Sequence, residues 1–136
     1  MILAQKDETS IVKKIKDFLN TCERTRCFKN HGSMFSEAGI HDIVGCSNGS
    51  FFSIEVKTPD NKKGTNKDGM TDTQIIFMND IIKAGGVAFS ATNLDQVVNE
   101  LFIKGLISQE DMDRGTDYKC VKKNADQNRY QIGSMA

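Results

Sequence analysis

Hydrophobic positions along the chain follow two periods, and each period predicts a different kind of element. Apolar residues at helical spacing predict helices over 7–20, 72–84 and 94–104. Mostly apolar, β-prone runs predict strands over 26–30, 40–46, 51–58 and 87–90. The resulting order, α-β-β-β-α-β-α, predicts an α/β fold with a mixed sheet flanked by helices. The helix over 72–84 is apolar on nearly every side, so we expect it to be largely buried.

Two segments lack any hydrophobic period. Residues 59–70 are punctuated by Pro, Asn, Asp and Gly and predict a long loop, of the kind that is often functional. After Gly105 the chain becomes polar. We therefore expect one domain over 1–105 and a C-terminal extension over 106–136. The extension should hold a short helix over 108–114 and a disordered tail from 124 onward.

The centre of the predicted sheet contains a hairpin signal. Asn48-Gly49 lies between two strand-like runs, and a type I′ turn needs positive φ at both of its central residues. In that register the numbers of facing residues sum to 97, which places Asp42 opposite Glu55. The sequence thus predicts two carboxylates side by side on one hairpin.

Strand alternation sorts the hairpin into two faces, because side chains two apart share a face. The polar face carries Asp42, Glu55 and Lys57. Facing carboxylates repel unless a positive charge lies between them or one of them takes up a proton. A divalent cation is the simplest occupant, so the hairpin predicts a metal site beside an ammonium group. The opposite, apolar face consists of Ile43, Phe52, Ile54 and Val56.

Composition narrows the class of protein. The chain has 136 residues, of which 38% are hydrophobic and 26% charged, which is typical of one globular domain. It shows neither a membrane-spanning run nor signal-peptide architecture, so we expect a cytoplasmic protein. Its four cysteines form no C-x-x-C pair, which favours free, mostly buried thiols over a zinc site.

Charge is balanced overall but unevenly distributed. The formal net charge is zero, which argues against a simple electrostatic coat for nucleic acid. Residues 1–30 nevertheless hold seven Lys or Arg against four acids, and residues 57–67 hold four lysines against one acid. Solvated surface charge explains most such lysines. The second group directly follows the predicted metal site.

The D…E-V-K arrangement of the hairpin resembles the PD-(D/E)xK nuclease superfamily. A wider set of features resembles the small stand-alone VRR-NUC domains of phages, which are similar to the nuclease domain of the Fanconi-associated nuclease. The resemblance covers about residues 5 to 103. It rests on Gly39-Ile40-His41-Asp42, Glu55-Val56-Lys57-Thr58, Gln74 at the start of a helix, and Gly85-Gly86 before a strand.

One position departs from the family pattern. The family has G-x-P-D, and here His41 stands where the proline would be. Proline would only help to hold the chain extended, so we expect metal binding to be spared. By alternation His41 should point away from Asp42 as an ordinary strand residue, with a contact to DNA phosphate as the alternative.

The resemblance implies a metal-dependent deoxyribonuclease and gives its residues roles. Asp42, Glu55 and the main-chain carbonyl of Val56 would bind Mg²⁺ or Mn²⁺. Lys57 would orient or deprotonate the attacking water and stabilise charge on the phosphate. Glu8 would reach the metal directly or through water, with Asp7 as the close alternative. From the helix pattern alone, Glu8 could equally favour the positive helix N-terminus.

Gln74 has two interpretations. Thr71-Asp72-Thr73-Gln74 fits a capping box, in which Gln74 bonds back to the main-chain N–H of Thr71. The resemblance instead implies that Gln74 faces the active site. We expect one of the two roles to be the main one and favour the active site.

For the substrate, the resemblance implies branched DNA such as a Holliday junction, cut by a homodimer. The candidate clamp for the DNA backbone is formed by Lys62, Lys63 and Lys67. Two alternatives remain. The neutral net charge favours a non-cleaving module, which would have a nuclease fold and bind DNA or a protein partner. A sequence-specific duplex endonuclease would share the chemistry but would need base-reading elements.

Overall fold

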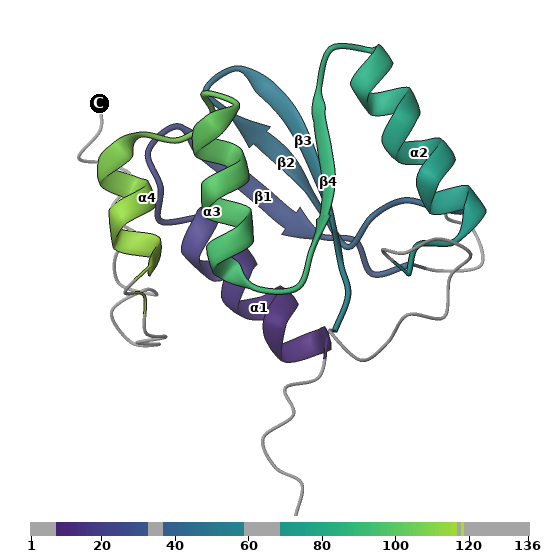
Figure 1. The fold of residues 1–136 in the computed structure, drawn as a ribbon, viewed down its shortest axis with the longest axis horizontal. Helices are drawn as coiled ribbons and strands as arrows, with labels where there is room; N and C mark the ends of the chain where they lie inside the picture. Colours follow the sequence, from purple (N-terminus) through teal and green to yellow (C-terminus); the bar gives the residue numbers. More distant parts are fainter. Residues whose placement is uncertain (1–7, 33–36, 59–68, 117, 119–136) are drawn as a thin grey trace, which may run out of the picture.

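The computed structural model describes residues 8–32, 37–58, 69–116 and 118 of the chain. Through α3 the element order is the predicted α-β-β-β-α-β-α, and α4 falls on the short helix predicted over 108–114 (Figure 1). In chain order the elements are α1 (Glu8–Leu19), β1 (Thr25–Lys29), β2 (Ile43–Ser47), β3 (Ser50–Val56), α2 (Asp72–Lys83), β4 (Val87–Ala91), α3 (Leu94–Ile103) and α4 (Gln109–Thr116).

The predicted hairpin register is confirmed. β2 and β3 pair antiparallel, with Ser47 opposite Ser50 at the turn and Ile43 opposite Ile54 at the far end. Asn48 has φ 50° and Gly49 has φ 85°, as a type I′ turn requires. The same register, continued one step beyond the last paired residues, brings Asp42 to Glu55.

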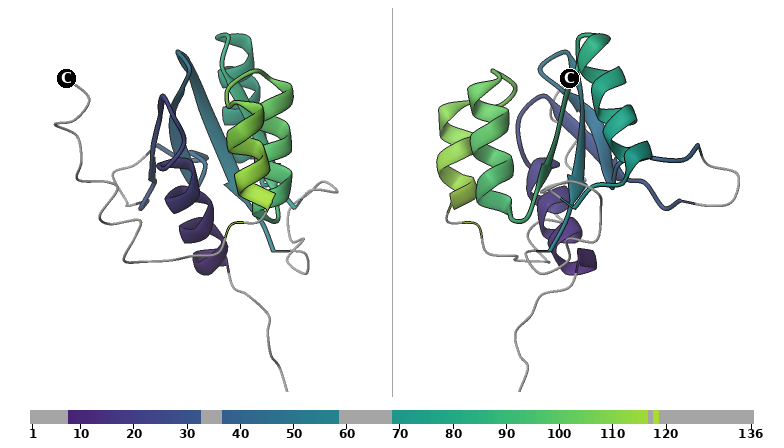
Figure 2. Two further views of the ribbon diagram at one scale, coloured as in Figure 1. Left: turned by 90° about the vertical axis from the view of Figure 1, so that its left-hand side faces the viewer. Right: turned by 45° about the vertical axis from the view of Figure 1, so that its right-hand side comes forward.

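The four strands form one mixed, open sheet in the order β1-β2-β3-β4. The pairs β1–β2 and β2–β3 are antiparallel, and β3–β4 is parallel. A parallel pair needs a crossover connection, which here contains α2. The right-hand view of Figure 2 shows α2 on one side of the sheet and α3 with α4 on the other. The chain is therefore a mixed α/β domain with helices on both faces of its sheet.

The main core lies on the face of the sheet that carries the predicted apolar residues. Ile43, Phe52, Ile54 and Val56 have no exposed surface. They join the buried stripe of α1 and the inner face of α3 in one cluster. Burying such a side chain contributes about 1.5–3 kcal/mol, so this face supplies most of the hydrophobic stabilisation. The helical residues of the cluster include Ile11, Val12, Ile15, Phe18, Leu19, Val97, Val98 and Leu101.

The prediction for α2 was right in type and wrong in burial. None of its side chains is buried, and Ile76 and Ile82 are 58% and 50% exposed. Among the described elements α2 is alone on its face of the sheet, so it has no neighbour to cover its outer side. Phe28 and Phe51 are also exposed, at 62% and 42%. An all-round apolar pattern predicts a helix, but it does not say how many neighbours surround that helix.

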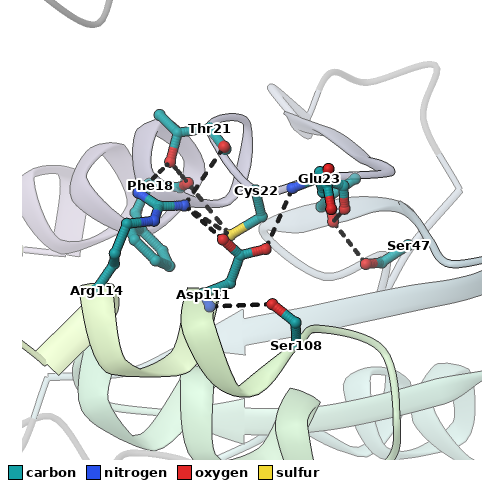
Figure 3. Close-up of polar contacts among 9 residues, drawn as sticks. Phe18, Thr21, Cys22, Glu23, Ser47, Ser108, Asp111 and Arg114 are labelled. Carbon is teal, nitrogen blue, oxygen red and sulfur yellow. Dashed lines mark hydrogen bonds and ion pairs between the residues drawn. The ribbon is translucent and has the colours of Figure 1, made fainter.

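The helix α4 is held by a polar cluster at the end of α1 (Figure 3). Asp111 is buried, and its Oδ2 accepts a hydrogen bond from the main-chain N–H of Glu23 at 3.2 Å. Its Oδ1 pairs with Nη2 of Arg114 at 2.8 Å. The Arg114 guanidinium lies 5.1 Å from the centre of the Phe18 ring and donates to the carbonyl of Thr21. The carboxylate is thus compensated, as a buried charge must be.

The segment before α4 also contacts the core and the hairpin. Leu106 and Ile107 are buried in the same cluster as α1 and α3. The Ser47 hydroxyl donates to the carbonyl of Leu106 at 2.8 Å, and Asn48 Nδ2 donates to the carbonyl of Gly105 at 3.2 Å. Leu106 and Ile107, directly after Gly105, therefore pack on the sheet domain.

Asp111→Ala should lower the free energy of unfolding by about 1–3 kcal/mol, because it leaves the Glu23 N–H and the Arg114 guanidinium without their buried acceptor. Urea unfolding would measure this change. The matched control is Asp113→Ala on the same helix, since Asp113 is exposed and accepts one surface hydrogen bond from Gln109. Equal effects of the two substitutions would contradict a special role for Asp111.

Two further predictions, on the cysteines and on membrane-spanning segments, bear on described residues. Cys22 and Cys27 are buried as expected, and burial is the main reason that the pKa of each thiol rises to about 12. Cys46 is exposed, because it lies on the sheet face that α2 only partly covers, so two of the three described thiols are buried, in agreement with the expectation of mostly buried thiols. In the described ranges, no helix is long and apolar enough to cross a membrane.

Candidate active site

The candidate site is centred on Glu55, on the polar face of the hairpin. This residue is 3% exposed and lies next to the end of β3, on the side of the sheet away from the main core. Its Oε2 accepts a hydrogen bond from Gln74 Nε2 at 3.0 Å and lies 3.4 Å from Lys57 Nζ. A carboxylate, an ammonium and an amide thus meet at one oxygen. Alternation along β3 explains why Glu55 and Lys57, two residues apart, share this face.

Asp42 is fixed against the end of the same strand. Its Oδ2 accepts a hydrogen bond from the main-chain N–H of Val56 at 2.8 Å. The Asp42 carbonyl accepts from the N–H of Asn30 at 2.8 Å, which ties the residue to the end of β1 as well. The side chain and the main chain of Asp42 are therefore both held by backbone N–H groups, one at the end of β3 and one directly after β1.

Burial and neighbouring charges both shift the protonation equilibrium of Glu55. The pKa of Glu55 is raised to about 8, first by burial and second by the negative charge of Asp42. The nearby ammonium of Lys57 opposes this rise, and the charge of Glu8 adds a smaller increase. The expected repulsion between the facing carboxylates is thus present, and Glu8 at the start of α1 lies within electrostatic reach. The arrangement favours either a proton or an additional positive charge at Glu55.

Gln74 completes the predicted capping box and also contacts Glu55. Its Oε1 accepts from the main-chain N–H of Thr71 at 2.9 Å, and the Thr71 hydroxyl accepts from the N–H of Gln74, which completes the capping box. Its Nε2 donates to Glu55. The expectation that one role would dominate was wrong, because the two ends of one amide serve different partners. The helix cap consequently holds the Gln74 amide in place for the carboxylate.

His41 lies where alternation did not predict it. It has no exposed surface, and its ring packs edge-on against Phe77 of α2 with centroids 5.0 Å apart. It precedes β2, which begins at Ile43, so regular alternation does not apply to it. The burial also removes the alternative of a contact between His41 and DNA phosphate.

The hydrogen bonds of His41 link β3 to the first turn of α2. Its Nε2 lies 3.0 Å from the main-chain carbonyl of Gln74, and its Nδ1 contacts the hydroxyl of Ser53. A carbonyl can only accept, so Nε2 carries the proton and the Ser53 hydroxyl donates to Nδ1. Burial lowers the pKa of His41, in agreement with a neutral ring. The imidazole therefore bridges the strand that carries Glu55 and the turn that carries Gln74.

Ser53 is the residue of this cluster that the sequence pattern left out. It is completely buried and lies two residues before Glu55, so alternation along β3 places both on one face. A buried hydroxyl on that face needs a partner. The signal was present, but nothing in the sequence identified His41 as the partner.

Several predicted site residues remain outside this geometry. Asp7, Lys62, Lys63 and Lys67 lie outside the described residues. Within the described ranges, no group of three or more His, Cys, Asp or Glu side chains could hold a metal ion. The assignments of Glu8 and of the Val56 carbonyl as metal ligands accordingly stay predictions.

The comparisons with known proteins do not assign a family. The chain matches no protein-family model, and a search of curated proteins found no match. The function must therefore be argued from the residues at the end of β3.

Proposed function

We propose that this protein is a metal-dependent DNA endonuclease that hydrolyses phosphodiester bonds. The observation that carries the proposal is the polar cluster at the end of β3, where two carboxylates lie together and one of them contacts both an ammonium and an amide. A buried acid with a strongly shifted pKa beside a specific charge partner is typical of functional sites. The same residues carry the resemblance to VRR-NUC domains of the PD-(D/E)xK superfamily.

The donor set suits a hard divalent cation. Mg²⁺ is commonly bound by one or two carboxylates and completes its shell with waters and substrate phosphate oxygens, so two acids are enough. Asp42 and Glu55 would hold Mg²⁺ or Mn²⁺, with Glu8 and the Val56 carbonyl as further ligands. When bound, the cation would supply positive charge that stabilises the phosphate in the transition state and lowers the pKa of a nucleophilic water.

The chain's own groups would orient the reaction. The Lys57 ammonium is 3.4 Å from Glu55 Oε2, close enough for both to bind one water. Lys57 would orient that water for in-line attack and stabilise the charge developing on the phosphate oxygens. Gln74 would keep Glu55 in one rotamer through its hydrogen bond. Products with 5′-phosphate and 3′-hydroxyl ends are what the resemblance implies.

We further propose branched DNA, such as a Holliday junction, as the substrate and a homodimer as the acting form. Both parts follow from the resemblance. The Lys62, Lys63 and Lys67 loop would clamp the DNA backbone next to the site.

A second candidate is a module that binds DNA or a protein partner without cutting. One observation favours it: the net charge of the chain is zero. The juxtaposed acids oppose it, because placing Asp42 against a buried Glu55 destabilises a protein that gains nothing from the pair.

Cleavage of a labelled four-way DNA junction would test the proposal. The native protein should cut with Mg²⁺ or Mn²⁺ and not with EDTA, whereas Glu55→Ala and Lys57→Ala should each lose at least about 100-fold in rate. Lys83→Ala, an exposed lysine at the end of α2, is the control and should cut normally.

The outcomes separate the candidates. Binding of the junction without cutting by the native protein would support the non-cleaving module. Equal cutting of the junction and plain duplex would remove structure selectivity and leave the duplex endonuclease as the enzyme candidate. Flap substrates in the same series would locate the preferred branch.

A further inference from the structure

A second polar feature lies at the edge of the sheet, outside the cluster around Glu55. Between α1 and the edge strand β1 there is a groove of about 460 Å³, which we call the basic groove. One wall is formed by α1 residues at positions 9, 13 and 16, a spacing that places them on one side of the helix, and by Asn20 directly after the helix. The other wall is β1 and the residues after it. The cationic side chains that line the groove are Lys13, Lys16, Arg26 and Lys29.

Asn20 fixes the two walls to one another. Its Oδ1 accepts from the main-chain N–H of Cys27 at 2.8 Å, and its Nδ2 donates to the Cys27 carbonyl at 3.1 Å. These bonds satisfy the outward-facing backbone groups of Cys27, at the middle of the edge strand, which would otherwise be open to another chain. Because the amide takes up those backbone groups, an added β-strand is not the occupant that this edge favours. The groove therefore remains a charged surface whose two walls, α1 and β1, are held at a fixed distance from one another.

The basic groove carries net positive charge. None of the described residues that line it is acidic. Asp17, which lies beside it on α1, pairs with Lys13 at 2.7 Å and with Lys16 at 3.4 Å. One carboxylate between two lysines leaves net positive charge. In the described part of the chain, neither Arg26 nor Lys29 forms an ion pair with a carboxylate.

The groove leads to the cluster around Glu55. Lys29 is the last residue of β1 and pairs with Ile43, the residue that follows Asp42. The next residue, Asn30, donates its N–H to the carbonyl of Asp42. On the other wall Thr9 directly follows Glu8, whose charge acts on Glu55. One end of the groove is therefore connected to the backbone of Asp42 on one wall and lies next to Glu8 in the sequence on the other.

We propose that the basic groove binds the phosphodiester backbone of a DNA strand and leads it to the carboxylate cluster. The proposal rests on the proposed function in naming DNA as the partner. A row of cations along a groove matches the repeated negative charge of a nucleic-acid backbone, and such contacts position a strand without reading its bases. It also gives a role to the excess of basic residues near the N-terminus, whereas the chain as a whole is neutral.

The test measures binding of a fluorescently labelled four-way DNA junction by fluorescence anisotropy. EDTA is present so that no cleavage takes place. The test variant is Arg26→Gln with Lys29→Gln, chosen because Lys13 and Lys16 are paired with Asp17. We expect affinity to fall about tenfold and the dependence of log affinity on log salt to become shallower by roughly 2, one for each phosphate that the variant no longer neutralises.

The matched control is Lys83→Gln with Lys104→Gln, which removes the same charge from exposed positions at the ends of α2 and α3. Thermal melts of both variants would verify that they are folded. Equal affinities and salt slopes for the two double variants, or no binding of the junction by the native protein, would overturn the proposal. A groove effect in a protein that never cleaves DNA would refute the proposed nuclease function while supporting the groove.

Discussion

The metal-free protein should lose stability as the pH rises from about 5 to about 8, whereas the Glu55→Gln variant should not show this loss. Burial and the charge of Asp42 raise the pKa of Glu55 to about 8, from an unfolded value of 4.5. Between these two values the folded state holds a proton that the unfolded state has released. The stabilisation is therefore complete below pH 4.5 and disappears as the pH passes through about 8.

The expected size follows from the same linkage. Each pH unit inside the window should lower the free energy of unfolding by about 1.4 kcal/mol relative to Glu55→Gln. The comparison between the two proteins cancels the other titrating groups. His41 would otherwise interfere, because burial lowers its pKa and its contribution rises with pH below about 6.5. Urea unfolding of both proteins at pH 5, 6.5 and 8, with EDTA present, would measure the difference.

A divalent cation should reverse the loss at the alkaline end of the window. Ionised Glu55 and Asp42 attract a cation, and a ligand that binds only the folded state raises stability with its concentration. Millimolar Mg²⁺ or Mn²⁺ should thus stabilise the native protein more at pH 8 than at pH 6, and should barely affect Glu55→Gln. Parallel pH curves for the two proteins, or the same metal response in both, would contradict a coupled carboxylate pair. This measurement needs no DNA and no activity.

The hairpin could be predicted from sequence because its determinants are local. The Asn48-Gly49 turn fixes the register, and the register fixes which side chains face one another, so Asp42 and Glu55 could be brought together by counting. The core face of β3 follows from the same alternation. The prediction that α2 is largely buried failed, because burial depends on elements that are distant in sequence. The hydrophobic pattern of a helix contains no information about them.

The hydrogen bonds that position Glu55 and the first turn of α2 could be predicted only in part. Gln74 was identified from a local capping motif, but its second hydrogen bond depends on how α2 sits on the sheet. The link from Ser53 through His41 to the same turn joins residues far apart in the chain. Such contacts arise from tertiary packing, and His41 escapes even strand alternation because it precedes β2. The acids were therefore predictable, and the groups that orient them were mostly not.

Gly39→Ala should destabilise the protein by about 3–5 kcal/mol, through backbone strain and overpacking together. Gly39 has φ +87°, and a Cβ at this position would overlap the main-chain carbonyl of Thr73, with its carbon only 2.7 Å away. Thr73 precedes Gln74 in the first turn of α2, so relief of the overlap requires that turn to move. The hydrogen bond between Gln74 and Glu55 should weaken with it. Urea unfolding would give the stability change.

The matched control is Gly85→Ala, at another glycine with positive φ. Gly85 has φ +99° and nothing within 4 Å of an added Cβ, so its substitution introduces backbone strain alone and should cost about 1–2 kcal/mol. The difference between the two variants isolates the contact between Gly39 and the first turn of α2. If α2 is held there by this close approach, Gly39→Ala should also reduce the extra stability that Mg²⁺ gives at pH 8, whereas Gly85→Ala should preserve it. Equal destabilisation with an unchanged metal response would show that Gly39 is needed only for its backbone conformation, and that α2 is positioned by His41 and the capping box.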